Sequence, residues 1–313
     1  MIAPLLLIAL GVSILYAGGE VLVRSSTALA NNLRINPLIV GLTVVAFGTS
    51  APELAVAVAA AVQGSPDIAV GNVVGSNIAN IGLILGLTVM LTPLAADRSF
   101  VRREVPFMIG TAFILIPFVL TGTLGRAQAL GLLALLAGFL WVLVRTGAMP
   151  TEEAEQKPRG NLWPAVLGSV AGLILLVGGA RLLVTAAVDL ARDFGVSDRV
   201  IGLTVVAFGT SVPELAGCLV AAARKQVGLI LGNIIGSNVF NTLLILPVAM
   251  LIHPIPVAFA ETGIDLLVML GFSVALLAFF WGGNRLNRAQ GTILFLGYLA
   301  YVGYLATLPT PGG

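Results

Sequence analysis

One sequence block occurs twice in this chain, and it constrains the fold more than any other feature. Residues 41–55 read GLTVVAFGTSAPELA and residues 202–216 read GLTVVAFGTSVPELA, so the two copies differ at a single position. A second pair follows, GNVVGSNIAN at 71–80 and GNIIGSNVFN at 232–241. Both pairs are offset by 161 residues, so no insertion or deletion separates the blocks within either half. The chain is therefore expected to be a tandem duplication.

The composition places this duplication in a membrane. Of the 313 residues 58% are hydrophobic and 10% are charged, and the mean hydropathy is +1.06. A soluble domain carries about 25% charged residues, so most of this surface must face lipid. The net charge of +2 then gives no reason to expect a nucleic-acid partner, and no obligatory protein partner is evident. One cysteine and one histidine cannot build a zinc site, so no cofactor is expected.

Apolar segments divide each half into five predicted transmembrane helices. They cover residues 2–23, 37–62, 67–93, 104–123 and 127–146, then 161–187, 198–222, 227–252, 257–282 and 290–308. Because five is odd, the second half must enter the membrane from the opposite side. The predicted fold is thus all-α, with ten transmembrane helices in two inverted-topology repeats, 1–146 and 161–313, joined by a hydrophilic linker at 147–160. Such repeats place a transport site at their interface, near the bilayer midplane.

Basic residues predict the orientation independently, because they are enriched on the cytoplasmic side. Only Arg126, Arg192 and Arg199 are expected on the side of the N-terminus. Both termini are therefore expected outside the cytoplasm, and the linker inside. Twelve basic residues are expected on the linker side: Arg24, Arg34, Arg98, Arg102, Arg103, Arg145, Lys157, Arg159, Arg224, Lys225, Arg285 and Arg288.

Two glutamates, Glu53 and Glu214, lie at equivalent positions inside otherwise apolar spans. An ionised carboxylate at that depth costs roughly 3 kcal/mol or more unless it faces a cavity or a cation. A protonated glutamate could instead serve only to join helices by a hydrogen bond. Two of them at matching positions of inverted repeats favour a functional site, because the repeat symmetry brings both to one place.

A proline precedes each glutamate and should break the helix there. Pro52 and Pro213 have no N–H and clash with the carbonyl four residues earlier. Such irregular backbone is tolerated within a membrane only where it lines a cavity, and it would present oxygen ligands of the kind that Na+ and Ca2+ prefer. These are the carbonyls of residues 46–48 and 207–209 and the hydroxyls of Thr49, Ser50, Thr210 and Ser211.

The second duplicated block predicts a neighbouring polar wall. Asn72, Ser76 and Asn80 are spaced four residues apart, so they share one face of a helix. The second copy repeats this spacing with Asn233, Ser237 and Asn241.

At these blocks the chain resembles prokaryotic members of the sodium/calcium exchanger family, within the cation/calcium antiporter superfamily. The motifs that carry the resemblance are GTSAPE (48–53), GNVVGSN (71–77), GTSVPE (209–214) and GNIIGSN (232–238). The resemblance implies antiport of Na+ against Ca2+ by alternating access, with spans one and six sliding as a gating pair. It implies a central Ca2+ site at Glu53 and Glu214. The further ligands that it implies are backbone oxygens of Thr49, Thr210, Ala46 and Ala207 and side chains of Ser50, Ser211, Ser76, Ser237, Asn80 and Asn241.

One position departs from the family pattern. Many members carry an aspartate where this chain has Asn241, and potassium-dependent members use that acid, so the resemblance disfavours potassium co-transport here. The two glutamates alone give a charge of −2, which balances one Ca2+ or two Na+ and does not fix a stoichiometry. A proton-coupled or Mg2+-transporting exchanger remains an alternative, with a passive cation channel less favoured. An enzyme is not expected, because Ser50 and Ser211 have no histidine or lysine nearby in the sequence to act as a base.

Overall fold

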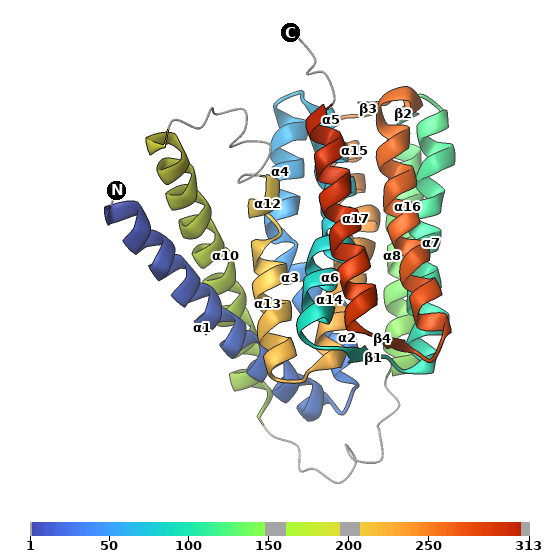
Figure 1. Ribbon diagram of the computed structural model, residues 1–313. Coiled ribbons are helices and arrows are strands. Elements are labelled where there is room, and N and C mark those ends of the chain that lie inside the picture. The colour runs from blue at the N-terminus through green and yellow to red at the C-terminus, as the bar shows by residue number, and fades with distance from the viewer. Residues whose placement is uncertain (1, 148–160, 195–206, 308–313) are drawn as a thin grey trace.

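The computed structural model describes residues 2–147, 161–194 and 207–307, and these residues are almost entirely helical (Figure 1). The proposed linker, apart from Gly147, lies outside the described residues. The first half contains α1 (Ile2–Leu33), α2 (Pro37–Val40), the π-helix η1 (Gly41–Val45), α3 (Ala46–Thr49), α4 (Ala51–Val62), α5 (Pro66–Ala79), the π-helix η2 (Asn80–Leu85), α6 (Gly86–Leu91), β1 (Leu94–Ala95), α7 (Arg98–Leu120), β2 (Thr123–Leu124) and α8 (Arg126–Gly147).

The second half repeats this order in the opposite direction across the bundle. In Figure 1, α1 begins at the end of the molecule where its equivalent α10 finishes, as expected for inverted repeats. The described elements are α10 (Leu162–Asp193), α12 (Ala207–Gly209), α13 (Val212–Ala223), α14 (Val227–Phe240), the π-helix η4 (Asn241–Ile245), α15 (Leu246–Ile252), β3 (Ile255–Pro256), α16 (Phe259–Trp281), β4 (Arg285–Leu286) and α17 (Arg288–Thr307).

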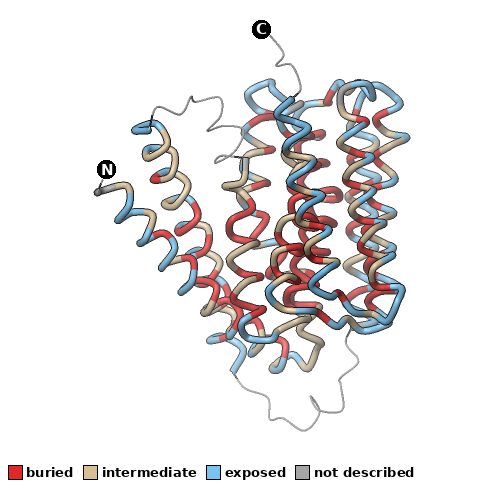
Figure 2. Tube along the Cα trace, in the orientation of Figure 1, coloured by how far each residue is buried: buried red, intermediate tan, exposed pale blue. Residues whose placement is uncertain are grey.

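The all-helical membrane fold predicted from the sequence is confirmed. Within the described ranges, eight helices are long and apolar enough to cross a bilayer, and a bent helix pair over 37–62 makes a ninth span. The span predicted at 198–222 begins outside the described residues, and its described part is α12 and α13. Exposed positions follow the outer faces of the bundle, as expected where those faces meet lipid (Figure 2).

The helices α1 and α10 extend beyond the spans predicted for them. Each has 32 residues and is therefore about 48 Å long at about 1.5 Å per residue, whereas the apolar core of a bilayer is about 30 Å thick. Both helices slant across the side of the bundle in Figure 1. The predicted ends at residues 23 and 187 were wrong because hydropathy detects only the apolar part of a helix, and both helices continue through more polar residues beyond it.

Glycines bring α1 and α10 into close contact at a symmetric crossing. A Cβ atom added at Gly172 would lie 2.6 Å from the backbone nitrogen of Leu22, and one added at Gly11 would lie 3.0 Å from that of Leu183. These two contacts are equivalent under the 161-residue offset. Because the neighbouring atoms belong to the backbone and cannot move aside, only glycine permits this separation. The two helices therefore pack mainly against each other.

An ion-pair cluster ties this pair to the rest of the molecule at the linker end. Arg224, which follows α13, donates from Nε to Glu20 Oε2 of α1 at 2.9 Å, and Arg24 lies 2.6 Å from the other oxygen of the same carboxylate.

Two short antiparallel strand pairs join the halves at opposite ends of the bundle, β1 with β4 and β2 with β3 (Figure 1).

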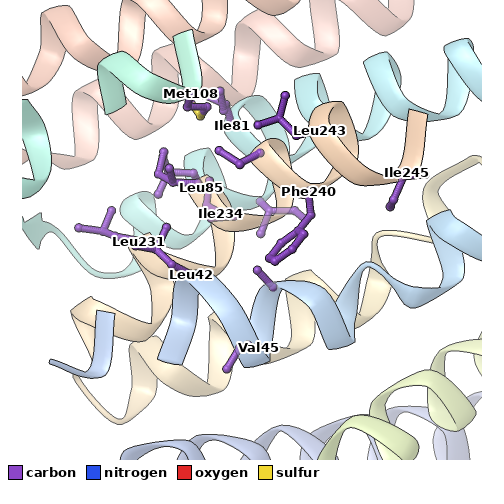
Figure 3. Packing of buried hydrophobic residues seen from close by; sticks show 14 of the residues in the cluster. Leu42, Val45, Ile81, Leu85, Met108, Leu231, Ile234, Phe240, Leu243 and Ile245 are labelled. Carbon is purple, nitrogen blue, oxygen red and sulfur yellow. The ribbon is translucent and has the colours of Figure 1, made fainter. Parts of the chain in front are cut away.

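The broken span and the second-block helix of the opposite repeat form the centre of the bundle. Leu42 of η1 and Ile234 of α14 are buried together with Ile81 and Leu85 of η2 (Figure 3). Gly232 allows this contact, because a Cβ there would lie 2.5 Å from the carbonyl oxygen of Leu38. The centre is thus apolar and closely packed except for the polar residues described next.

Candidate cation site

Both helix breaks lie at the residues that the prolines predict. Ser50 separates α3 from α4 with φ −80° and ψ 8°, and Ser211 precedes α13 with φ −90° and ψ 3°. The segments on either side of Ser50 are bent by 44°. Glu53 and Glu214 are each the third residue of the helix after the break, where free N–H groups and the helix dipole stabilise a carboxylate.

The two breaks meet, and each serine binds the glutamate of the other repeat. Ser50 Oγ donates to Glu214 Oε1 at 3.1 Å, and Ser211 Oγ donates to Glu53 Oε1 at 3.4 Å. Both glutamates are only 1% exposed. The structure therefore places these four residues together at the interface of the repeats, with one oxygen of each carboxylate occupied by a hydroxyl.

Oxygen atoms without hydrogen-bond donors are concentrated at this interface. The described part of the chain contains nine buried side-chain polar atoms that lack a partner, and five of them belong to residues predicted for the site. Leaving a polar atom buried and unpaired costs about 1–3 kcal/mol, and more when it is charged. Carboxylate, amide and hydroxyl oxygens of this kind are ligands for hard cations. They are Oε2 of Glu53, Oε2 of Glu214, Oδ1 of Asn80, Oδ1 of Asn241 and Oγ of Ser237.

A chain of buried amides explains why the two asparagine oxygens stay free. Asn80 Nδ2 donates to Asn238 Oδ1 at 2.9 Å, and Asn241 Nδ2 donates to Asn77 Oδ1 at 3.0 Å. These bonds are again equivalent under the 161-residue offset. Because each NH2 group is held by its partner, the carbonyl oxygen of Asn80 and of Asn241 is directed away from that bond and can accept a cation.

Asn77 and Asn238 are therefore positioning residues for which the sequence predicted no role. Both stand in the duplicated block, one residue after the serine, and this repetition is the signal that could have identified them. Asn77 also donates to Thr242 Oγ1 at 3.0 Å, which fixes its own amide. The backbone contributes as well, since Asn80 begins η2 and Asn241 begins η4, and π-helices are frequent at functional sites.

Each of these π-helices packs against a helix of the opposite repeat. The helix η2 packs against α13, which holds Glu214, and η4 packs against α4, which holds Glu53. On the side of Glu53, Asn72 Nδ2 donates to the Glu53 carbonyl oxygen at 3.2 Å. The π-helices that begin at Asn80 and Asn241 thus each contact the helix that holds the glutamate of the opposite repeat.

The remaining side chains predicted for the site differ in how deeply they are buried. Ser76 and Ser237 are buried on α5 and α14, and Thr49 is buried and donates from Oγ1 to Asn233 Oδ1 at 3.0 Å. Thr210, the repeat mate of Thr49, is half-buried. Thr49 therefore has its hydroxyl engaged by α14, and its backbone oxygen is what remains for a ligand.

The two breaks also differ in their backbone hydrogen bonds. Ser50 N–H donates to the Ala46 carbonyl at 3.1 Å, four residues back, whereas Ser211 N–H donates to the Phe208 carbonyl at 3.1 Å, three residues back. The Ala46 carbonyl is thus engaged by the Ser50 N–H, and the Thr49 hydroxyl also lies 3.4 Å from it. The tighter turn in the second repeat leaves the Ala207 carbonyl outside that bond.

This set of ligands suits hard cations. The described residues contain no group of three histidine, cysteine, aspartate or glutamate side chains that could hold a metal ion. The charge of the site comes from the two carboxylates, and its other oxygens are hydroxyl, amide and peptide carbonyl. Such oxygen-only sets select Na+, Ca2+ and similar ions over transition metals.

Comparison with known proteins identifies one family over both halves. The family model described as sodium/calcium exchanger protein matches residues 3–145 and again residues 164–307. The chain is 33% identical to the sodium/calcium exchanger MaX1 of Methanosarcina acetivorans, over 95% of this chain and 97% of that protein. It is 33% identical to the inner membrane protein YrbG of Escherichia coli, over 97% of each. A solved structure of the sodium-calcium exchanger NCX_Mj, soaked with Na+ and no Ca2+, superposes with a TM-score of 0.84 at 32% identity, covering 98% of this chain and 99% of that one.

Proposed function

We propose that this chain, which belongs to the sodium/calcium exchanger family, exchanges Na+ for Ca2+ across the membrane at the site between Glu53 and Glu214. Family membership makes it a multi-pass transporter and not an enzyme. The ion pair is proposed by analogy with MaX1 and NCX_Mj, whose names specify sodium/calcium exchange.

One observation carries the proposal: the two buried carboxylates meet at the helix breaks, and five residues predicted for the site, both glutamates among them, each have a buried side-chain oxygen without a donor among the described residues. Without a cation, two negative charges would stand close together in a medium of low dielectric constant, which is strongly unfavourable. One Ca2+ or two Na+ neutralise them. Both ions therefore compete for the same oxygens, and the site resists moving across the membrane empty, which is the physical basis of exchange without leak.

Each predicted residue receives a role in this scheme. Glu53 and Glu214 bind Ca2+ centrally. The serines and asparagines supply neutral oxygens that Na+ can use when Ca2+ is absent, and the broken helices supply peptide carbonyls. These further ligands are Ser50, Ser211, Ser76, Ser237, Asn80 and Asn241 through their side chains and Ala46, Ala207, Thr49 and Thr210 through their backbones.

We assign the alternation of access to α1 and α10. Their glycine crossing makes them a unit of their own, and both contact α13 beside the site. The repeats 1–146 and 161–313 then supply equivalent gates on the two sides. The basic residues favour an orientation with both termini outside and the linker 147–160 in the cytoplasm.

A transport assay with purified protein separates this function from its alternatives. We expect proteoliposomes loaded with Na+ to take up radiolabelled Ca2+, and to do so without K+, because Asn241 and Asn80 are neutral. Uptake that follows a pH gradient instead of a Na+ gradient, or Mg2+ uptake in place of Ca2+, would establish the proton-coupled or Mg2+ alternative. Ionic current with no counter-ion would identify a channel.

A further inference from the structure

A third buried carboxylate with a free oxygen lies outside the exchange site, against a cavity between α7 and α8. The cavity has a volume of about 600 Å³ and is lined by Glu104, Arg103 and the apolar surface of α8. Glu104 is 1% exposed. Arg103 donates from Nε to Glu104 Oε1 at 2.7 Å, but Oε2 has no donor among the described residues.

In the second repeat, the carboxylate equivalent to Glu104 has a hydrogen-bond donor that the first repeat lacks. Asp265 of α16 is the repeat mate of Glu104, and it accepts a hydrogen bond from the Tyr301 hydroxyl of α17 at 2.8 Å. Arg126-Ala127-Gln128 and Arg288-Ala289-Gln290 show that α8 and α17 match at an offset of 162, so Phe139 corresponds to Tyr301. The first repeat therefore has the same ring without the hydroxyl, and Phe139 lines the cavity beside Glu104.

The rest of the cavity has the features of a lipid-binding site. Gly131, Ala134 and Gly138 open a groove along α8 where larger residues would fill it. At the linker end of that groove, Arg145 lies over the Trp141 ring at 5.4 Å, and tryptophan with arginine is typical of the boundary between headgroups and acyl chains. The Arg103 side chain is 46% exposed, so it retains donors for an anionic group outside the bundle.

We propose that this cavity binds a membrane lipid with a primary ammonium and a phosphate, a phosphatidylethanolamine of the leaflet on the linker side. The ammonium donates to Glu104 Oε2 in place of the absent tyrosine hydroxyl. Arg103 faces the phosphate, and an acyl chain occupies the groove of small residues on α8. The charges of the cavity match those of the headgroup. The buried Glu104 carboxylate faces the ammonium, and the more exposed arginines face the phosphate.

Binding can be measured by native mass spectrometry of the intact protein in a mixture of lipids with the same acyl chains. The probes are phosphatidylethanolamine, its monomethyl and dimethyl derivatives, phosphatidylcholine and phosphatidylglycerol. A charge-assisted hydrogen bond corresponds to about tenfold in affinity, so we expect retention of phosphatidylethanolamine about tenfold above phosphatidylcholine, with a stepwise decrease upon methylation. Equal retention of all the lipids, or preference for phosphatidylglycerol, would overturn the proposal.

Phe139→Tyr provides the sharpest variant, because it supplies the hydroxyl that the second repeat uses. We expect it to remove the preference for phosphatidylethanolamine, as should Glu104→Gln. Phe113→Tyr makes the same chemical change on an exposed part of α7 outside the cavity and should retain the preference. Thermal unfolding checks that each variant is folded. A preference that persists in folded Phe139→Tyr and Glu104→Gln protein would contradict the assignment.

Discussion

Replacement of Glu53 or Glu214 by glutamine should reduce Na+-driven Ca2+ uptake about 100-fold or more. Each substitution keeps the size of the side chain and removes half of the negative charge that faces the ion. Removing one partner of a buried charge interaction costs about 3–5 kcal/mol, which corresponds to at least about 100-fold in affinity. Because the two glutamates are equivalent under the repeat symmetry and equally buried, the two variants should be impaired to a similar extent.

The matched control is Asp97→Asn, which removes one negative charge from an exposed loop residue before α7. Its uptake should equal that of the unmodified protein. Full uptake by both glutamine variants would place the transport site elsewhere, and loss in all three variants would indicate a nonspecific effect of charge.

Gly172→Ala should slow transport about tenfold while leaving equilibrium Ca2+ binding unchanged. The new methyl group would lie 2.6 Å from the backbone nitrogen of Leu22, so α1 and α10 would have to separate. Overpacking of this kind costs about 1–3 kcal/mol, and a cost near the middle of that range is about tenfold in rate. Binding persists because neither helix contributes a ligand in the proposed site.

Gly178→Ala is the control on the same helix, because a Cβ at that position meets no described atom within 4 Å. It should transport at the normal rate. Equal rates for the two alanine variants would show that the α1–α10 crossing does not limit transport, and a loss of Ca2+ binding in Gly172→Ala would show that the crossing supports the site itself.

The sequence predicted the parts of this protein that depend on local chemistry and on duplication. The offset of 161 residues gave two equivalent halves, and Pro52 and Pro213 marked both helix breaks to within a residue or two. The symmetry of the repeats also predicted that Glu53 and Glu214 would meet, and the structure joins them through Ser50 and Ser211.

Features set by contacts between distant helices could not be predicted in the same way. The spacing of Asn72, Ser76 and Asn80 indicated one regular helix, whereas the backbone changes to a π-helix at Asn80. The π-helix packs against α13 of the other repeat, a contact that the residue spacing within one block does not reveal. The partners of Asn80 and Asn241 were missed for the same reason, since Asn238 and Asn77 belong to opposite halves.

The central claim is that Na+ and Ca2+ share one site between Glu53 and Glu214, and ion density in crystals tests it most directly. Crystals soaked in Ca2+, or in Sr2+ for its anomalous signal, should show one strong peak bound by Oε2 of both glutamates, and the peak should decrease as Na+ replaces the divalent ion. A divalent-ion peak at another position, with none between the two carboxylates, would contradict the account.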